Sequence, residues 1–335
     1  MKHRLLEGAL NPYKHHLWRL PSIPEAKQPE SYPDKSHECV AVIPLFQGQP
    51  DDVALEHHLV RAACWSRRSW LLFSDAVELG IKIGFYVGDT VIDRVFPILE
   101  ENRINIDSDV FIMNESVFEG DPVNCLGKKM SVFCDEQFLD YRWIVQLDCD
   151  LWLGSPNRDS LDFFQYVVTH DTVGIGSGTA HAEPYSAAPY ANLEDTVWWK
   201  CLLDSDDKAA QCAVWIERAR SLVGDVVEAY MDDDIWCIDG SGGIYTFPIQ
   251  YYHSERPDLV DWVARAGQLL QDDEAVFSLW RMMGEPFYSI SDELGVQSCF
   301  TVEDILSAHE RGDVYFSHLA NLCAEWFWRE DADAL

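Results

Sequence analysis

The first half of the chain alternates between short apolar runs and longer segments with a helical pattern. Apolar runs suited to buried strands lie at 39–46, 81–89, 108–114 and 142–148. Helical patterns lie between them, at 56–80, 90–102 and 128–141. The first helix is expected to end at Gly80 as its C-cap, and Pro97 interrupts the second. Strands and helices that alternate at this spacing predict an α/β fold with a mostly parallel, doubly wound sheet flanked by helices.

The second half continues this pattern less regularly. Further strands are predicted at 171–178, 236–247 and 314–319, and further helices at 196–230, 257–270 and 271–284. No internal repeat and no clean linker interrupts the chain, which predicts one domain over 38–326 with an insertion at about 178–235. A proline-rich N-terminal arm, 1–37, precedes this domain, and an acidic tail, 327–335, follows it.

The charge of the chain excludes two classes of partner. It carries 57 acidic residues against 25 lysines and arginines, a formal net charge of −32. Such a surface repels nucleic acid and anionic lipid, so neither is expected as a primary partner. An anionic substrate would need a locally cationic pocket, formed by the scarce basic residues or by a metal ion.

The cysteines and the hydropathy pattern predict a cytoplasmic protein. The ten cysteines lack paired spacing, which indicates buried free thiols in a reducing compartment. No apolar run approaches the 18 residues of a membrane span, and the basic N-terminus lacks the apolar core of a signal peptide.

One of five D-x-D motifs stands in a distinctive position. Asp148 and Asp150 close the apolar strand at 142–148 and precede a further apolar stretch, Leu-Trp-Leu. The other four begin at Asp107, Asp204, Asp232 and Asp331, in polar stretches or before a strand. Ligands of parallel sheets bind at the carboxyl ends of strands, and paired carboxylates suit Mg²⁺ or Mn²⁺. The alternative is a solvated turn.

These features together resemble a known family. Three βα units, a segment with Lys128 and Lys129, and an apolar strand ending in D-x-D resemble the GT-A fold glycosyltransferases. The nearest resemblance, over about 38–326, is to the glycogenin and lipopolysaccharide galactosyltransferase group. It implies that Asp148 approaches the nucleotide ribose and the metal, and that Asp150 binds the metal. The metal would then bridge the two phosphates of a nucleotide sugar.

A late segment is similar to a second motif of this family, H-x-x-G-x-x-K-P-W. His318 and Trp326 keep its separation of eight residues, whereas Asn321, Ala324 and Glu325 replace its Gly, Lys and Pro. The resemblance implies that His318 is the third metal ligand. Because Ala324 replaces the Lys of the motif, weaker binding of the diphosphate is expected. The alternative is a structural histidine.

The resemblance implies roles for other residues. For the nucleotide these are Pro44, Phe46, Asp89, Lys129 and Asp148. For the sugar or acceptor they are Asp239, Gly242 and Gly243. Asp272 and Asp273 open a helix, where they would accept sugar hydroxyls or act as a catalytic base. The structural alternatives are strand-end packing, a surface lysine, a β-bulge and first-turn acids that complement the helix dipole.

The function implied is metal-assisted transfer of a sugar from a nucleotide diphosphate sugar, by expectation a UDP-sugar, to an acceptor hydroxyl. Mn²⁺ or Mg²⁺ would stabilise the departing diphosphate. One alternative is a HAD-like phosphatase with Asp148 as nucleophile, whose motif should stand nearer the start of the sheet. A nucleotidyltransferase would need a glycine-rich basic loop, and 46–52 has one glycine and no basic residue. A non-catalytic carbohydrate-binding protein is the third alternative.

Overall fold

The computed structural model describes ten stretches of the chain: 38–47, 57–118, 126–149, 151–153, 161–176, 217–224, 243–270, 273–290, 296–299 and 316–319. The predicted N-terminal arm, the acidic tail and most of the predicted insertion lie outside these stretches. No helix in them is long and apolar enough to cross a membrane.

A seven-stranded sheet forms the centre of the described part. Its strands are β1 Cys39–Leu45, β2 Lys82–Gly88, β3 Val110–Met113, β4 Trp143–Leu147, β6 Val173–Ile175, β7 Ile244–Phe247 and β8 Phe287–Ser289. They lie in the order β3-β2-β1-β4-β7-β6-β8. Within this sheet β7 runs antiparallel to both neighbours, and the other pairings are parallel. The predicted mostly parallel α/β sheet is confirmed.

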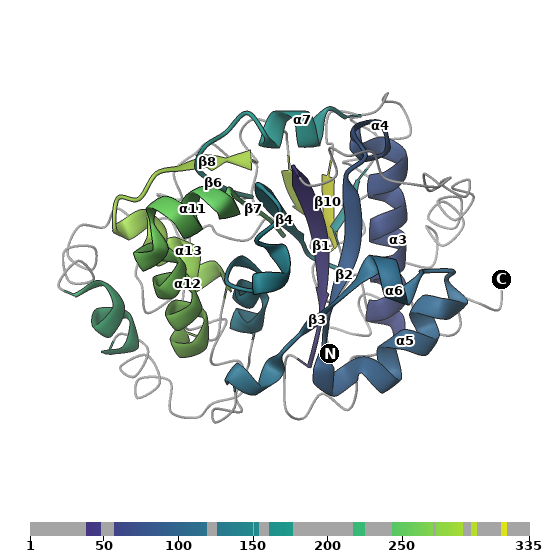
Figure 1. Cartoon of the computed structure of the whole chain (residues 1–335), viewed down its shortest axis with the longest axis horizontal. Helices are drawn as coiled ribbons and strands as arrows, with labels where there is room; N and C mark the ends of the chain where they lie inside the picture. Colours follow the sequence, from purple (N-terminus) through teal and green to yellow (C-terminus); the bar gives the residue numbers. More distant parts are fainter. Residues whose placement is uncertain are drawn as a thin grey trace, which may run out of the picture.

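Helices cover both faces of this sheet (Figure 1). One face carries α3 His57–Phe73, α4 Ala76–Leu79, α5 Ile92–Glu101 and α7 Phe163–Val167. The other carries α11 Ile249–Glu255, α12 Pro257–Leu270 and α13 Asp273–Met282. Strand β1 is buried along its whole length. Its side chains alternate between the hydrophobic cores on the two faces of the sheet. Burial on both faces explains why the strand is a continuous apolar run.

The predicted helix over 56–80 is wrong in one respect, because two helices form there. The Ser74 hydroxyl donates back to the Trp70 carbonyl at 2.5 Å, and Ser74 bridges to Leu161 outside the helix. The Asp75 carboxylate instead accepts the backbone N–H of Phe164, at the start of α7. The second helix does end at Gly80, which has a left-handed φ of 69°.

The predicted helix over 128–141 is also wrong. Two 3₁₀ segments occupy this stretch, η5 Leu126–Phe133 and η6 Glu136–Phe138. A 3₁₀ helix places side chains three residues apart on one line, and two such pairs are buried here: Lys129 with Val132, and Met130 with Phe133.

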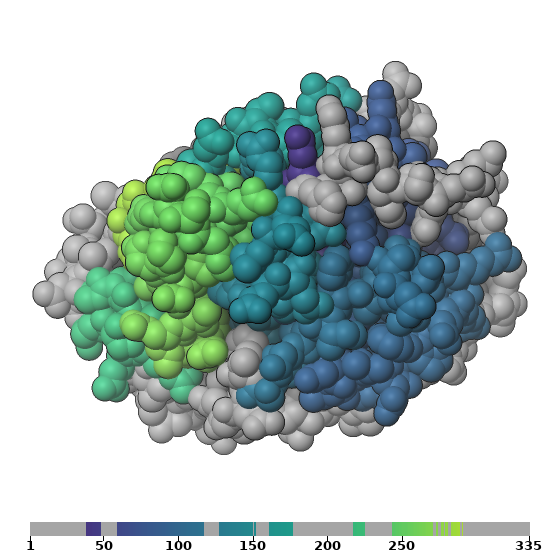
Figure 2. Space-filling view, in the orientation of Figure 1, coloured from purple at the N-terminus to yellow at the C-terminus, as the bar shows by residue number. Residues whose placement is uncertain are grey.

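The segment η5 packs closely against α12. A side chain at Gly267 of α12 would place its Cβ 2.9 Å from the Gly127 carbonyl oxygen, so glycine permits this approach. Figure 2 shows the green surface of α11–α13 beside the blue-green surface of the chain between β3 and β4. The segment η5, which carries Lys129, therefore lies between α12 and strand β4 of the sheet.

A smaller sheet follows the D-x-D motif. Its strands are β5 Leu151–Leu153, β10 Phe316–Leu319 and β9 Val296–Cys299, in the order β5-β10-β9. The antiparallel pairing of β5 with β10 aligns His318 with Leu151. The Ser66 hydroxyl of α3 donates to the Leu151 carbonyl at 2.5 Å and ties this sheet to the main domain.

Among the cysteines whose side chains the structure describes, Cys39, Cys64, Cys134 and Cys149 are all free thiols. Burial raises the pKa of the Cys64 and Cys134 thiols to about 12. The prediction of free thiols is confirmed for these four.

Candidate functional site

The candidate site begins where β4 ends. Asp148 follows the last residue of this fully buried strand, and its backbone N–H donates to the Gly243 carbonyl at 2.7 Å. Gly243 has a left-handed φ of 68° and directly precedes β7. The Asp148 carbonyl accepts the Leu151 N–H at 3.1 Å, which closes a turn into β5. Backbone hydrogen bonds therefore fix the position of Asp148 between β4 and β5.

A buried lysine joins two carboxylates at this turn. The Lys129 Nζ lies 2.9 Å from Oδ1 of Asp148 and 3.1 Å from Oδ2 of Asp273. Lys129 is 9% exposed, and the carboxylate side chains of Asp148 and Asp273 are 15% and 5% exposed. These residues come from η5, the end of β4 and the first position of α13. The structure thus brings together four predicted site residues: Asp148, Lys129, Asp273 and Gly243.

The two carboxylates determine the charge state of Lys129. Burial by itself lowers the pKa of its ammonium, but Asp148 and Asp273 outweigh burial and hold the pKa above its ordinary value. The ammonium is therefore charged throughout the neutral range. The Lys129 ammonium faces two carboxylates, so the three groups together carry more negative than positive charge. Such a cluster suits the binding of a cation or of hydroxyl donors.

A further member of the site was not predicted. Gln146 lies in β4, two positions before Asp148, and is fully buried. Its Nε2 donates to Oδ1 of Asp148 at 3.3 Å, and its Oε1 has no hydrogen-bond partner among the described residues. The signal was present in the sequence as one polar residue inside the apolar run at 142–148.

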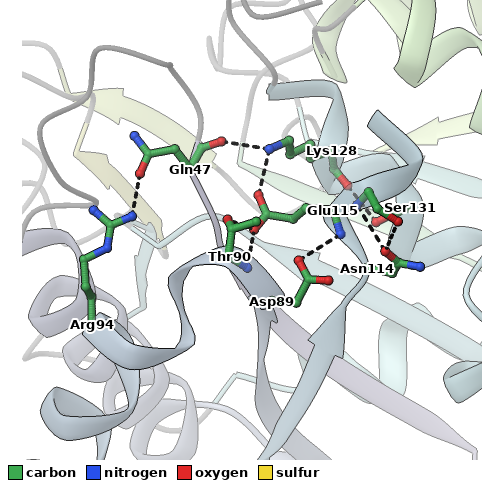
Figure 3. Close-up of polar contacts among 9 residues, drawn as sticks. Gln47, Asp89, Thr90, Arg94, Asn114, Glu115, Lys128 and Ser131 are labelled. Atoms are coloured by element: carbon green, nitrogen blue, oxygen red, sulfur yellow. Dashed lines mark hydrogen bonds and ion pairs between the residues drawn. The ribbon is translucent and has the colours of Figure 1, made fainter. Parts of the chain in front are cut away.

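A second polar network lies at the carboxyl ends of the neighbouring strands (Figure 3). Its centre is Glu115, which follows β3 and is 3% exposed. Lys128 donates to Oε1 of Glu115 at 2.7 Å and to the Gln47 carbonyl at 3.2 Å. Oε2 of Glu115 accepts the Thr90 N–H at 3.1 Å and also the Thr90 hydroxyl. This network ties together the chain segments that leave β1, β2 and β3.

Asp89, predicted to contact the nucleotide, belongs to this second network. Its Oδ1 accepts the Glu115 N–H at 3.3 Å. Gly88 precedes it, and a Cβ there would overlap the Glu115 carboxylate, so glycine allows Glu115 to lie against β2. Arg94 of α5 donates to the side-chain oxygen of Gln47 at 2.9 Å (Figure 3). Neither Glu115 nor Gln47 had a signal in the sequence.

Pro44 and Phe46 occupy the end of β1. Pro44 is paired in register with Tyr86 of β2 and is buried. Phe46 is 8% exposed and belongs to the core on the side of η5. Both residues pack the end of the strand, so their predicted contact with a nucleotide base stays a prediction.

The remaining predicted residues lie partly or wholly outside the described stretches. These are Asp150, Asp239, Gly242 and Asp272. His318 is described only as a backbone position of β10, aligned with the residue that follows Asp150 in the sequence. Among the described side chains, no group of three or more His, Cys, Asp and Glu residues could hold a metal ion.

Comparison with known proteins gives matches at the level of structure. No family model and no curated protein matches the chain. Mouse xyloside xylosyltransferase 1 in its apo form is 11% identical, with 85% of this chain and 99% of that chain covered and a TM-score of 0.44. The mannosyltransferase Ktr4p from S. cerevisiae is 10% identical, with coverages of 85% and 79% and a TM-score of 0.45.

A third similar structure is the galactosyltransferase LgtC in complex with donor and acceptor sugar analogs. It is 13% identical, with 88% of this chain and 96% of that chain covered and a TM-score of 0.43. All three are named as glycosyltransferases, the class that the sequence resembles.

Proposed function

We propose that the protein is a glycosyltransferase that moves a sugar from a nucleotide diphosphate sugar to an acceptor hydroxyl. The observation that carries this proposal is the Lys129 ammonium held between Asp148 and Asp273 at the carboxyl end of β4. Strand order supports the location. From β1 the chain continues to β2 and β3 on one side, and β4 lies on the other. Ligands of open α/β sheets bind at such a reversal, beyond the carboxyl ends of the strands.

The nucleotide would bind beside this cluster, at the ends of β1 and β2. Pro44 and Phe46 would contact the base, and Asp89 the base or ribose. Lys129 would offset part of the carboxylate charge near the diphosphate, and a bound metal ion would supply the net positive charge. In a chain with a net charge of −32, such a cation is needed to admit an anionic donor. UDP is the nucleotide we expect.

The metal would be Mn²⁺ or Mg²⁺, held by Asp148, Asp150 and His318. Carboxylate oxygens are hard ligands that suit both ions, and imidazole is a common ligand of transition metals. The alignment of the His318 backbone with Leu151 supports a common location for these ligands. A bound metal would supply Lewis-acid stabilisation of the charge on the departing diphosphate.

The sugar and acceptor would lie on the Asp273 side of the cluster. Asp239, Gly242 and Gly243 would line this side, where glycine allows close approach to the backbone. Asp272 and Asp273 would accept hydrogen bonds from sugar hydroxyls or take the proton of the acceptor. An ionised carboxylate is an acceptor only, and therefore suits both roles.

Thermal unfolding with candidate nucleotides tests this proposal. The protein would be melted with UDP, GDP, CDP or phosphate, each with Mn²⁺ or with EDTA. A ligand at about 100 times its Kd adds about 2.7 kcal/mol of stability, so the Tm should rise by several degrees. We expect the rise with UDP and Mn²⁺ together and little with either alone.

The variant Asp150→Ala should abolish this rise. The matched control is Asp107→Ala, which removes the first carboxylate of another D-x-D motif at an exposed position. That control should keep the full rise. Release of free sugar from a UDP-sugar would separate a transferase from a non-catalytic carbohydrate-binding protein. Absence of a shift with every nucleotide and metal would contradict the proposal.

A further inference from the structure

Gln146 is a polar side chain in a strand that is otherwise apolar. By register its backbone lies beside Val42 of β1 and Tyr245 of β7, in the middle of the sheet. It is 0% exposed. Because side chains alternate along a strand, Gln146 and Asp148 point to the same face, the one covered by η5 and α13. The amide is therefore placed directly behind the carboxylate of the proposed site.

The amide and the lysine share one oxygen of Asp148. Nε2 of Gln146 lies 3.3 Å from Oδ1, and Nζ of Lys129 lies 2.9 Å from the same atom. The reverse orientation of the amide would set its oxygen against the carboxylate oxygen, two acceptors facing each other. The orientation with the NH₂ group toward Asp148 is the one that electrostatics favours.

This orientation leaves the amide oxygen in an unfavourable position. Oε1 is buried and has no hydrogen-bond partner among the described residues. Buried polar atoms are nearly always paired, and an unpaired one lowers stability. An apolar residue of the same length would fill the position without this penalty. Stability of the fold therefore does not explain a glutamine here.

We propose that Gln146 is a positioning residue that fixes the orientation of the Asp148 carboxylate. With donors from two directions on Oδ1, the carboxylate cannot rotate about its Cβ–Cγ bond without breaking one of them. The backbone of Asp148 is already held by Gly243, and the amide together with Lys129 restrains its side-chain torsions. As a neutral donor, Gln146 does this without adding charge to the site. This role rests on the proposed function, in which Asp148 contacts the donor nucleotide and the metal.

The substitution Gln146→Met separates positioning from packing. Methionine keeps the length of the side chain and removes both amide atoms. The variant should unfold at the same urea concentration as the wild type or at a higher one, because the unpaired oxygen is gone. Asp148 loses a donor, so kcat for donor hydrolysis should fall about tenfold, and the Mn²⁺ concentration for half of the UDP-dependent melting shift should rise. Gln146→Leu should give the same pattern.

A control in the adjacent strand should show the opposite pattern. Thr246 of β7 lies beside Val145 by register and donates to or accepts from the Tyr288 hydroxyl at 2.6 Å. It is buried, and its side chain points to the other face of the sheet. The substitution Thr246→Val removes this bond, so it should lower the urea midpoint and leave kcat and the Mn²⁺ requirement unchanged.

Lower kcat with unchanged or higher stability in Gln146→Met supports a positioning role. Unchanged kcat overturns it, and so does a loss of activity that accompanies a loss of stability, because packing would then explain both. A wild-type protein without any nucleotide response overturns the proposed function and with it this role. A wild-type response that Gln146→Met retains in full overturns the positioning role alone.

Discussion

Lys128 and Lys129 are neighbours in the sequence, yet they belong to different polar networks. Lys128 contacts one carboxylate, Glu115, and a backbone carbonyl, whereas Lys129 lies between Asp148 and Asp273. Glu115 also accepts two hydrogen bonds from Thr90, so its charge does not depend on Lys128 alone. The contribution of each lysine to stability therefore depends on how many hydrogen bonds its carboxylate partners keep when the lysine is removed.

The largest effect should come from removing each lysine in turn. Lys129→Met leaves the Asp273 and Asp148 carboxylates without their shared ammonium, and only the neutral Gln146 amide still donates to Asp148, so the free energy of unfolding should fall by about 3–5 kcal/mol. Lys128→Met leaves Glu115 with its bonds from Thr90, so the loss should be about 1–2 kcal/mol. Urea denaturation of both variants and the wild type measures the two values. Equal losses of unfolding free energy in the two variants would show that both networks depend on their lysine to the same extent.

A smaller effect is the coupling between Lys129 and Asp273. In a double-mutant cycle with Lys129→Met and Asp273→Leu, the interaction term should be about 1–3 kcal/mol, because the two groups are in contact. The cycle of Lys128→Met with Asp273→Leu provides the control. Lys128 and Asp273 have different partners among the described residues, so their effects should add to within about 0.5 kcal/mol. A coupling of the same size in both cycles would mean that the networks act as one unit.

The smallest expected effect is that of pH on the Lys129 network. A lysine whose pKa is raised in the folded state contributes stability that is complete below its unfolded pKa, about 10.4. This contribution is lost only as pH rises through the still higher folded pKa. The stability difference between the wild type and Lys129→Met should therefore stay constant from about pH 7.5 to 9.5. Urea denaturation across this range measures it, and a difference that shrinks toward pH 9.5 would contradict the geometry described.

Much of the fold could be predicted from the sequence, because buried strands are continuous apolar runs. The exceptions depend on contacts with distant residues. The break between α3 and α4 involves Ser74 and Asp75, whose partners Leu161 and Phe164 lie more than 80 positions away. The 3₁₀ segment η5 packs against α12, which lies more than 100 positions later in the sequence. Neither of these contacts is visible in a local pattern of apolar positions.

Some members of the candidate site could be proposed from the sequence, but their arrangement could not. Asp148 was proposed because it closes an apolar strand, and Asp273 because its segment resembles an acidic segment that opens a helix in the family named above. Their connection through Lys129 joins positions that are 19 and 144 residues apart, which no local pattern reveals. Gln146 left a weak signal, one polar residue in an apolar strand. Glu115 left none, because an acidic residue after a strand is ordinary.

The separation of 144 residues between Lys129 and Asp273 also bears on how the protein is made. A ribosome completes β1 to β4 and the first lysine–carboxylate pair long before it reaches α13. During that interval a nascent chain has Lys129 and Asp148 but lacks Gly243, β7 and Asp273. The first half of the sheet can therefore form early, since its strands are close in sequence. The cluster that defines the candidate site is assembled only in the last quarter of synthesis, so a shortened chain would have much of the framework without the site.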